Sequence, residues 1–471
     1  LKLVEEKKIR EELKKKQKEL EKKIKLQKIA EQERIKKERR ERKASEKKRE
    51  QDRKIKEKQR IAEERKLREE LKRKEKEIEK QKKLMKQQQN KTQSSQVLEK
   101  NKMIKNGARK TYMQMSAASL KQAITSDHSV SWRLLDFFSN HFSVSTSGRL
   151  MVGLSPTLER EAIAPNLLGN FADMLLAVEQ HPAMLIYLNN EKSFGPNSRM
   201  AKKRKVGLNE NLAREIMELH TLGVDGGYSQ ADVIELAKGI TGWSVKRAKK
   251  EHGTGFVFRD YGHEPGARTL LGMKYSQRGL SQGQQMLRDL AMHPSTAKYV
   301  CTKIAHHFVS ENPAQSLIEK MQKTWLNNQG NIKQVMLTLF DAEEAWLESP
   351  QKFKTPREFV ISSYRAIAPN RINDRTLFNS LTNLGQMPFN AGSPAGFSDE
   401  ESDWLGASAL MARVEWSSLV SAQVKRINAE QVMATALGSS ISQNTYQMVM
   451  RAESRQQAST LLLMSPEFQR R

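Results

Sequence analysis

The amino-acid sequence predicts an all-α protein: a mainly helical globular domain with a minor β-hairpin, preceded by a long charged single helix or partial coiled coil. Residues 1–86 contain neither Gly nor Pro and consist almost wholly of Lys, Arg, Glu, Gln and aliphatic residues. Helix is the only regular structure that this composition supports. In the remainder, apolar residues recur mainly at helical spacing and strand signals are few.

Charge divides the 471 residues unevenly. Residues 1–110 hold 44 Lys or Arg and 22 Asp or Glu, a net charge of +22, whereas the remaining 361 residues hold 39 and 33, a net charge of +6. We therefore expect a charged helix at residues 1–86, a polar linker at residues 87–110 and a globular domain at residues 111–471. The high isoelectric point belongs mostly to the first part.

The charged segment is expected to form an isolated helix about 130 Å long. Pairs of Glu with Lys or Arg four residues later recur in it, and each contributes roughly 0.2–0.5 kcal/mol. A coiled coil requires apolar a and d positions throughout, but Ala44 and Ile55 are the only aliphatic residues between Lys36 and Arg60. Coiled-coil pairing is therefore expected at most near the ends of the helix.

A polycationic helix of this kind favours contact with acidic surfaces, such as RNA, microtubules or anionic lipid. The alternative is that the charge only keeps the helix solvated. Specific nucleic-acid recognition is not favoured, because no aromatic residue that could stack on a base precedes Tyr112. The sequence predicts no transmembrane segment and no signal peptide, and its start at Leu1 leads us to expect a fragment or a fused reading frame.

The globular part is expected to be built from helices joined by short loops, with one short hairpin. Strand-like alternation occurs only at Trp243–Lys246 and Gly255–Arg259. Apolar spacing predicts the following helices: Ser131–Asn140, Leu158–Ala164, Phe171–Val178, Pro182–Asn189, Leu212–Leu222, Gln230–Thr241, Gly283–Met292, Ser295–Ser310, Ala314–Asn327, Ile332–Phe340, Pro356–Ala368, Arg375–Leu384 and a C-terminal run to Phe468.

The most informative stretch is Gly207–Trp243. Gly223 stands where a helix commonly stops in the left-handed conformation, and Ser229 with Asp232 resembles a capping box that opens the next helix. Glu210, Arg214 and Glu218 follow one another at four-residue spacing, which predicts a ladder of ion pairs along the first helix.

This stretch resembles the signature of the bacterial domain of unknown function 1800 family. Asn189 and Phe397 depart from the family's pattern, where an aspartate and a tryptophan are expected. Further motifs follow the family's order: Asn140–Ser145, Arg160–Pro165, His181–Asn190, Gly195–Ser198, Gly262–Pro265, His293–Ala297, Lys352–Pro356 and Ser465–Phe468. The resemblance covers about residues 115–471 and leaves residues 1–110 outside. It implies an exported or periplasmic bacterial protein and carries no known reaction.

The candidate site residues lie within or beside these motifs: His141, His181, Glu210, Arg214, Glu215, Glu218 and His220. If their helices converge, His141 or His181 could join Glu215 and Glu218 in a metal site or an acid/base pair. On a regular α-helix His220 points about 140° away from Glu215. The adjacent His306 and His307 also face different directions and are not expected to act together.

A structural alternative is a buried network in which Arg160 and Arg214 neutralise Glu161 and Glu218. The nine His and single Cys residues exclude a multi-thiolate zinc site and an intrachain disulfide, but they leave the cofactor and any metal unknown. Because no complete nucleophile–base or ligand motif is present, the sequence favours a non-catalytic scaffold. The family resemblance implies that such a scaffold would act in the bacterial envelope and bind an exported protein or polymer. The alternative is a metal-dependent or acid/base hydrolase with its site on the Asn209–His220 helix.

Overall fold

The protein is mainly helical, as predicted, and has two small antiparallel sheets. The computed structural model describes residues 2–89, 95–246, 255–368, 372–423 and 428–471. Its contacts divide the chain into two compact units, residues 1–99 and 100–471. Among the described residues, no helix combines the length and the apolarity needed to cross a membrane.

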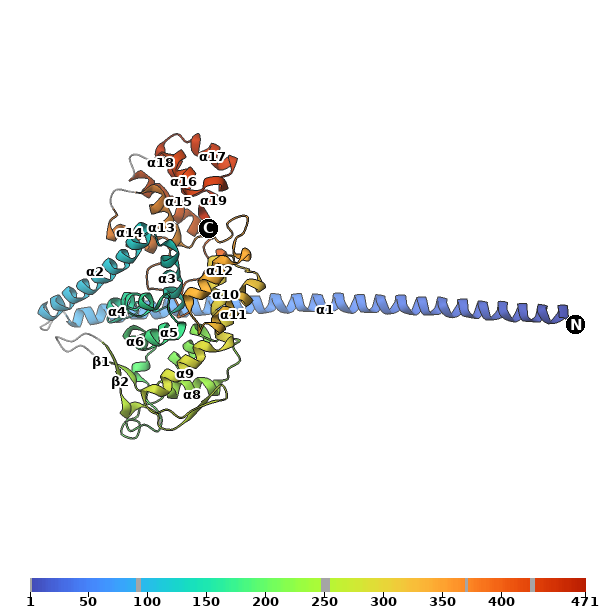
Figure 1. Cartoon of the computed structure of the whole chain (residues 1–471), viewed down its shortest axis with the longest axis horizontal. Coiled ribbons are helices and arrows are strands. Elements are labelled where there is room, and N and C mark those ends of the chain that lie inside the picture. The colour runs from blue at the N-terminus through green and yellow to red at the C-terminus, as the bar shows by residue number, and fades with distance from the viewer. Residues whose placement is uncertain (1, 90–94, 247–254, 369–371, 424–427) are drawn as a thin grey trace. The chain divides into compact units, whose positions relative to one another are not determined.

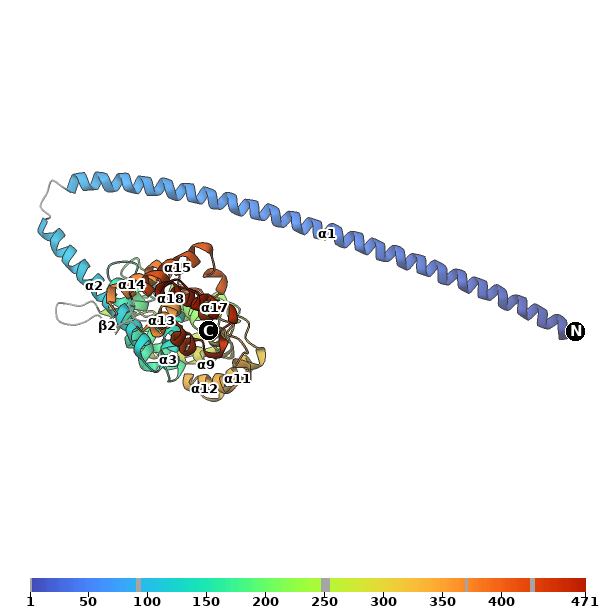
Figure 2. The ribbon, with the colours of Figure 1, turned by 90° about the horizontal axis from the view of Figure 1, so that it is seen from above.

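The first unit is dominated by α1 (Lys2–Gln89), one unbroken helix in both views of the chain (Figures 1 and 2). Its 88 residues extend about 130 Å. The large apolar side chains described along it, from Leu3 to Ile35, are 45–79% exposed, so this part of the helix has no core of its own. Of the expected linker, residues 90–94 lie outside the described residues, and residues 95–110 begin the next helix, α2 (Ser95–Thr125).

The second unit contains the remaining elements (Figure 1). Its helices are α3 (Ser129–His141), α4 (Met151–Leu158), α5 (Phe171–Glu179), α6 (Pro182–Tyr187), α7 (Asn211–Glu215), α8 (Gln230–Gly239), α9 (Leu280–Met292), α10 (Pro294–Phe308), α11 (Gln315–Asn327), α12 (Ile332–Asp341), α13 (Pro356–Ile367), α14 (Asp374–Asn383), α15 (Ala407–Ala422), α16 (Ala429–Ala436), α17 (Gln443–Met450), α18 (Arg455–Leu463) and α19 (Pro466–Gln469).

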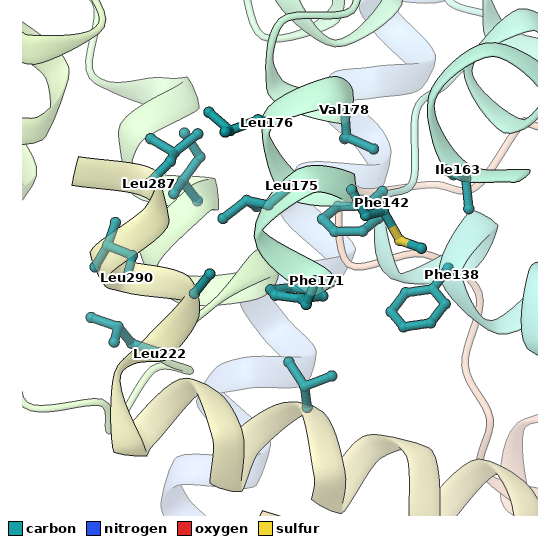
Figure 3. Close-up of a cluster of buried hydrophobic side chains, with 14 of the residues drawn as sticks. Phe138, Phe142, Ile163, Phe171, Leu175, Leu176, Val178, Leu222, Leu287 and Leu290 are labelled. Atoms are coloured by element: carbon teal, nitrogen blue, oxygen red, sulfur yellow. The ribbon is translucent and has the colours of Figure 1, made fainter. Parts of the chain in front are cut away.

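The larger hydrophobic core is built mainly from α3 to α12. Figure 3 shows Leu287 and Leu290 of α9 in the same buried cluster as Leu175 and Leu176 of α5. Behind them, the rings of Phe142 and others of α3 and α5 pack in aromatic contact. A second cluster joins the last turns of α2 to α13, α14, α15 and the C-terminal helices. Ion pairs join α3 to α13, between Arg357 and Asp136 and between Arg133 and Glu358.

The predicted hairpin is present and a second one was missed. β1 (Trp243–Lys246) pairs antiparallel with β2 (Gly255–Phe258). The additional pair is β3 (Arg268–Leu270) with β4 (Met273–Tyr275). Its strands have only three residues each, too few for alternation to be recognised in the sequence. Leu271 and Gly272 form its turn, and both have positive φ, as a tight hairpin turn requires.

The expected caps are observed, but two expected α-helices contain π-helical turns. Ser229 and Asp232 form the capping box of α8, and Gly223 has a φ of 82°. The helix expected at Leu212–Leu222 is α7 followed by the π-turn Ile216–His220, and the one expected at Leu158–Ala164 consists largely of the π-turn Glu159–Ile163. A π-turn bonds residues five apart instead of four, so angles calculated for an α-helix do not hold across it.

Candidate functional site

His220 and Glu179 form a completely buried side-chain pair. The His220 Nδ1 to Glu179 Oε1 distance is 2.8 Å, and neither side chain is exposed. The expected direction of His220 relative to Glu215 was calculated for a regular α-helix and does not carry over to the π-turn Ile216–His220. Burial raises the pKa of Glu215, and the nearby His220 opposes this rise.

His141, at the end of α3, lies beside this pair. Its Nε2 is 3.1 Å from the backbone carbonyl oxygen of His220. Burial, together with the charge of Lys303, lowers the pKa of His141 well below its usual value, so the ring is neutral near pH 7. A carbonyl oxygen can only accept, so Nε2 donates its hydrogen and Nδ1 keeps a lone pair. That Nδ1 is buried and has no hydrogen-bond partner among the described residues.

His181 begins α6 and has a structural contact on each ring nitrogen. Its Nδ1 accepts a hydrogen bond from the backbone amide of Ala183, which caps the helix. Its Nε2 lies 3.3 Å from Glu161, which also pairs with Arg160 at 2.6 Å. The Arg160 and Glu161 side chains are 65% and 49% exposed. The expected ion pair therefore exists, but it is not buried as the structural alternative proposed.

The predicted ladder on the signature helix is confirmed. Arg214 lies 3.4 Å from Glu210 and 3.2 Å from Glu218, and it also donates to Gln230 at 2.7 Å. These side chains are about one-third exposed. Glu215, half-buried beside the ladder, has a pKa raised by burial and by the nearby Glu218.

The structure therefore distributes the predicted residues over separate contacts. His181 contacts Glu161, His220 contacts Glu179, and Arg214 occupies the two ladder glutamates. Within the part of the chain that the structure describes, no three His, Cys, Asp or Glu side chains are grouped so that they could hold a metal ion.

A cavity of about 380 Å³ lies where α3, α10, the start of α13 and the loop between α14 and α15 meet. His141 is the only one of the predicted site residues that lines it. The other ionisable side chains that line it are Asp136 of α3, Lys303, His306 and His307 of α10, Arg357 and Glu358 of α13, and Asp399 and Glu400 of the loop.

His306 and His307 share one carboxylate, contrary to the expectation that they do not act together. The Nδ1 atoms of His307 and His306 lie 3.0 Å and 3.5 Å from Oδ2 of Asp399, and Nε2 of His306 lies 3.0 Å from Glu400. Adjacent rings on a helix do diverge, but the loop carries Asp399 between them. Burial alone would raise the pKa of Asp399, but its hydrogen bonds to both rings and the charge of Lys352 hold that pKa far below its usual range.

His307 differs from His306 in its second ring nitrogen. Its Nε2 is buried and has no hydrogen-bond or ion-pair partner among the described residues. Burial lowers the pKa of His307 although Asp399 opposes this. At pH 7 the ring is therefore neutral, with its hydrogen on Nδ1 facing Asp399 and a lone pair on Nε2.

The remaining wall is a set of compact ion pairs. Arg471 lies 2.6 Å and Arg133 3.5 Å from Oε1 of Glu358, and Arg357 lies 2.6 Å from Asp136. Burial disfavours the charge of Glu358, but Arg471 and Arg133 outweigh it and lower the pKa to about 2. Burial raises the pKa of Asp136, although Arg357 opposes this rise. The pairs fix the side chains of the wall in place.

Lys303 is the exception in this wall. Its Nζ lies 5.4 Å from the centroid of the Tyr299 ring, and no hydrogen bond or ion pair joins it to the other described residues that line the cavity. Burial lowers its pKa to about 8, against a smaller opposing effect of Asp399. Lys303 and His307 stand four residues apart, and hence on one face of α10.

The sequence contained a partial signal for this site. His306 and His307 stand in a predicted helix. Asp399 lies in a loop whose sequence has no periodic pattern, so the contact of Asp399 with both rings depends on long-range packing. Arg471 reaches Glu358 because the last residues pair with Lys352 and Phe353 through backbone hydrogen bonds and a bridge.

The fold and the cavity define an all-α protein with a charged internal site between two cores. The family described as "Protein of unknown function (DUF1800)" matches residues 7–470. The chain therefore belongs to this family, whose description assigns no activity. The match begins at residue 7 and therefore includes most of α1. The resemblance expected from the motifs covered only residues 115–471 and left residues 1–110 outside. Comparisons with curated proteins and with solved structures gave no match.

Proposed function

We propose that the cavity is the site of an acid/base hydrolase in which His307 is the general base and Asp399 orients it. One observation carries this proposal: His307 contacts Asp399 through Nδ1, while Nε2, its basic atom, is unpartnered among the described residues. A neutral imidazole held by a carboxylate is the arrangement that general-base catalysis requires.

The reaction follows from that arrangement. Nε2 of His307 takes a proton from water as the water oxygen attacks the carbonyl carbon of an ester or amide. Asp399 stabilises the imidazolium that forms and stays ionised. The imidazolium then returns the proton to the departing oxygen or nitrogen as the scissile bond breaks, which leaves the acid and the alcohol or amine as products.

The test is hydrolysis of a panel of 4-nitrophenyl esters by the full chain. We expect His307→Gln to lower kcat/KM about 100- to 10,000-fold, the usual range for loss of a general base. His293→Gln is the matched control, because His293 caps the same helix through a backbone amide and lies outside the cavity lining. Equal activity of the folded His307→Gln variant would refute the assignment.

A second measurement does not depend on finding a substrate. Nitrogen-15 NMR of the histidine rings at pH 7 should show His307 neutral, with its hydrogen on Nδ1. A charged ring, or a hydrogen on Nε2, would also contradict the proposed role.

We propose a structural role for the signature helix, in place of the hydrolase site expected there. The ladder of Glu210, Arg214 and Glu218 supports this, since each glutamate is occupied by Arg214. Glu218→Ala is then expected to lower stability and leave ester hydrolysis unchanged. If the whole domain is instead a scaffold for an exported protein or polymer of the bacterial envelope, no variant of the cavity changes any hydrolytic rate.

The excess of positive charge in residues 1–110 supports a separate proposal, that α1 contacts acidic surfaces. We also propose that the chain consists of a charged helix at residues 1–86, a linker at residues 87–110 and a globular domain at residues 111–471. Binding of the full chain to vesicles of anionic and of neutral lipid, at low and high salt, tests the contact. Equal binding to both kinds of vesicle would contradict it.

A further inference from the structure

The charges around the cavity do not balance locally, and the imbalance lies at Lys303. Four carboxylates line the cavity, and each contacts a cation or a histidine: Asp136, Glu358, Asp399 and Glu400. The Arg357 guanidinium in the same wall is occupied by Asp136. Among the charged side chains that line the cavity in the described part of the chain, Lys303 alone has neither a hydrogen bond nor an ion pair.

Lys303 is partly buried, so its ammonium is incompletely hydrated and has no counter-charge, and an anion placed beside it would be favourable. The Tyr299 ring offers only the weaker attraction of an aromatic face. A cavity of about 380 Å³ has room for a small ligand bearing such an anion.

We propose that the ligand of this cavity carries an anionic group, a carboxylate or a phosphate, that pairs with Lys303. The inference deepens the proposed hydrolase, since Lys303 and His307 share one face of α10. Lys303 would then hold the charged end of a substrate while its ester or amide group lies at His307.

The groups that face Lys303 agree with this assignment. His141 of α3 is neutral near pH 7 and offers a lone pair but no charge. Asp399 of the loop is committed to His306, His307 and Lys352. No other carboxylate of the lining is unpaired and able to take the place of a ligand anion.

The binding experiment is isothermal titration of the full chain with adipate and, separately, with inorganic phosphate. We expect at least one of them to bind the wild type, and binding to weaken at least tenfold in Lys303→Met. Lys303→Arg should retain binding because it keeps the charge. Lys298→Met, an exposed lysine of the same helix, is the control for the loss of one positive charge.

The pH dependence gives an independent check. Adipate is fully ionised above pH 7, so its affinity should fall about tenfold between pH 7 and pH 9 as Lys303, with a pKa of about 8, loses its proton. The proposal is overturned if neither anion binds the wild type, or if Lys303→Met binds as tightly as Lys298→Met.

The catalytic experiment compares the release of 4-nitrophenol from mono(4-nitrophenyl) adipate with its release from the methyl ester of that compound, in which the carboxylate is esterified and uncharged. We expect the wild type to prefer the charged ester and Lys303→Met to lose the preference. If hydrolysis needs His307 but shows no preference for the charged ester, and neither anion binds, the role of Lys303 is overturned and the proposed hydrolase stands. If an anion binds and needs Lys303 but no ester is hydrolysed, the proposed hydrolase is overturned and the role of Lys303 stands.

Discussion

The buried pair of His220 and Glu179 should dominate the stability of the second unit. His220→Leu leaves Glu179 without a partner at a site where neither side chain is exposed. Removing one member of such a pair costs roughly 3–5 kcal/mol. The entropy of unfolding is about 2.1 cal/mol/K per residue, so it is about 0.8 kcal/mol/K for the 372 residues from 100 to 471. The Tm should therefore fall by roughly 4–6 °C.

The measurement is tryptophan fluorescence during urea and thermal unfolding. The first tryptophan is Trp132, so the signal reports the second unit and not α1. The double variant His220→Leu/Glu179→Leu should regain most of the lost stability, because apolar replacement of a whole buried pair is often neutral or stabilising. Arg160→Leu is the control, because it breaks an exposed pair and should cost less than about 1 kcal/mol. A double variant less stable than His220→Leu would refute the reasoning.

Two further predictions concern a buried lysine and the charged helix. Burial lowers the pKa of Lys354 to about 7, so the unfolded chain binds more protons than the folded chain above that pH. Stability relative to Lys354→Met should therefore rise by about 2 kcal/mol from pH 7 to pH 9 in urea unfolding; a fall would contradict the assigned shift. A peptide of residues 1–86 should have the same helical circular dichroism at all concentrations, whereas a rise with concentration would indicate a coiled coil.

Local patterns predicted the helices but not the departures from α-helical geometry. Ser229, Asp232 and Gly223 act within a few residues of their own positions, so their caps and turns could be predicted. The π-turn at Ile216–His220 inserts one residue into a helical turn without any breaker in the sequence. It therefore changed the direction of His220 without altering the apolar pattern that predicted the helix.

The candidate cavity could be predicted less well, because its parts come from distant segments. His307 and Asp399 are 92 residues apart, and Arg357 and Asp136 lie on helices of the two different cores. Short-range spacing carries no information about such pairs. The sequence did single out His141, because it lies in a family motif at the end of a predicted helix.

His141 connects the signature helix to the cavity. The π-turn places the carbonyl oxygen of His220 where it accepts from Nε2 of His141, and this fixes the hydrogen on the side of the ring that faces the signature helix. The opposite nitrogen, Nδ1, keeps its lone pair and has no hydrogen-bond partner among the described residues, and the His141 side chain lines the cavity. His307 offers a second acceptor, Nε2, and Lys303 a positive charge. The signature helix thus supports the cavity from behind, while the motif residues Asn140, His141 and Thr355 line it, which explains why the signature helix can identify the family without displaying its site.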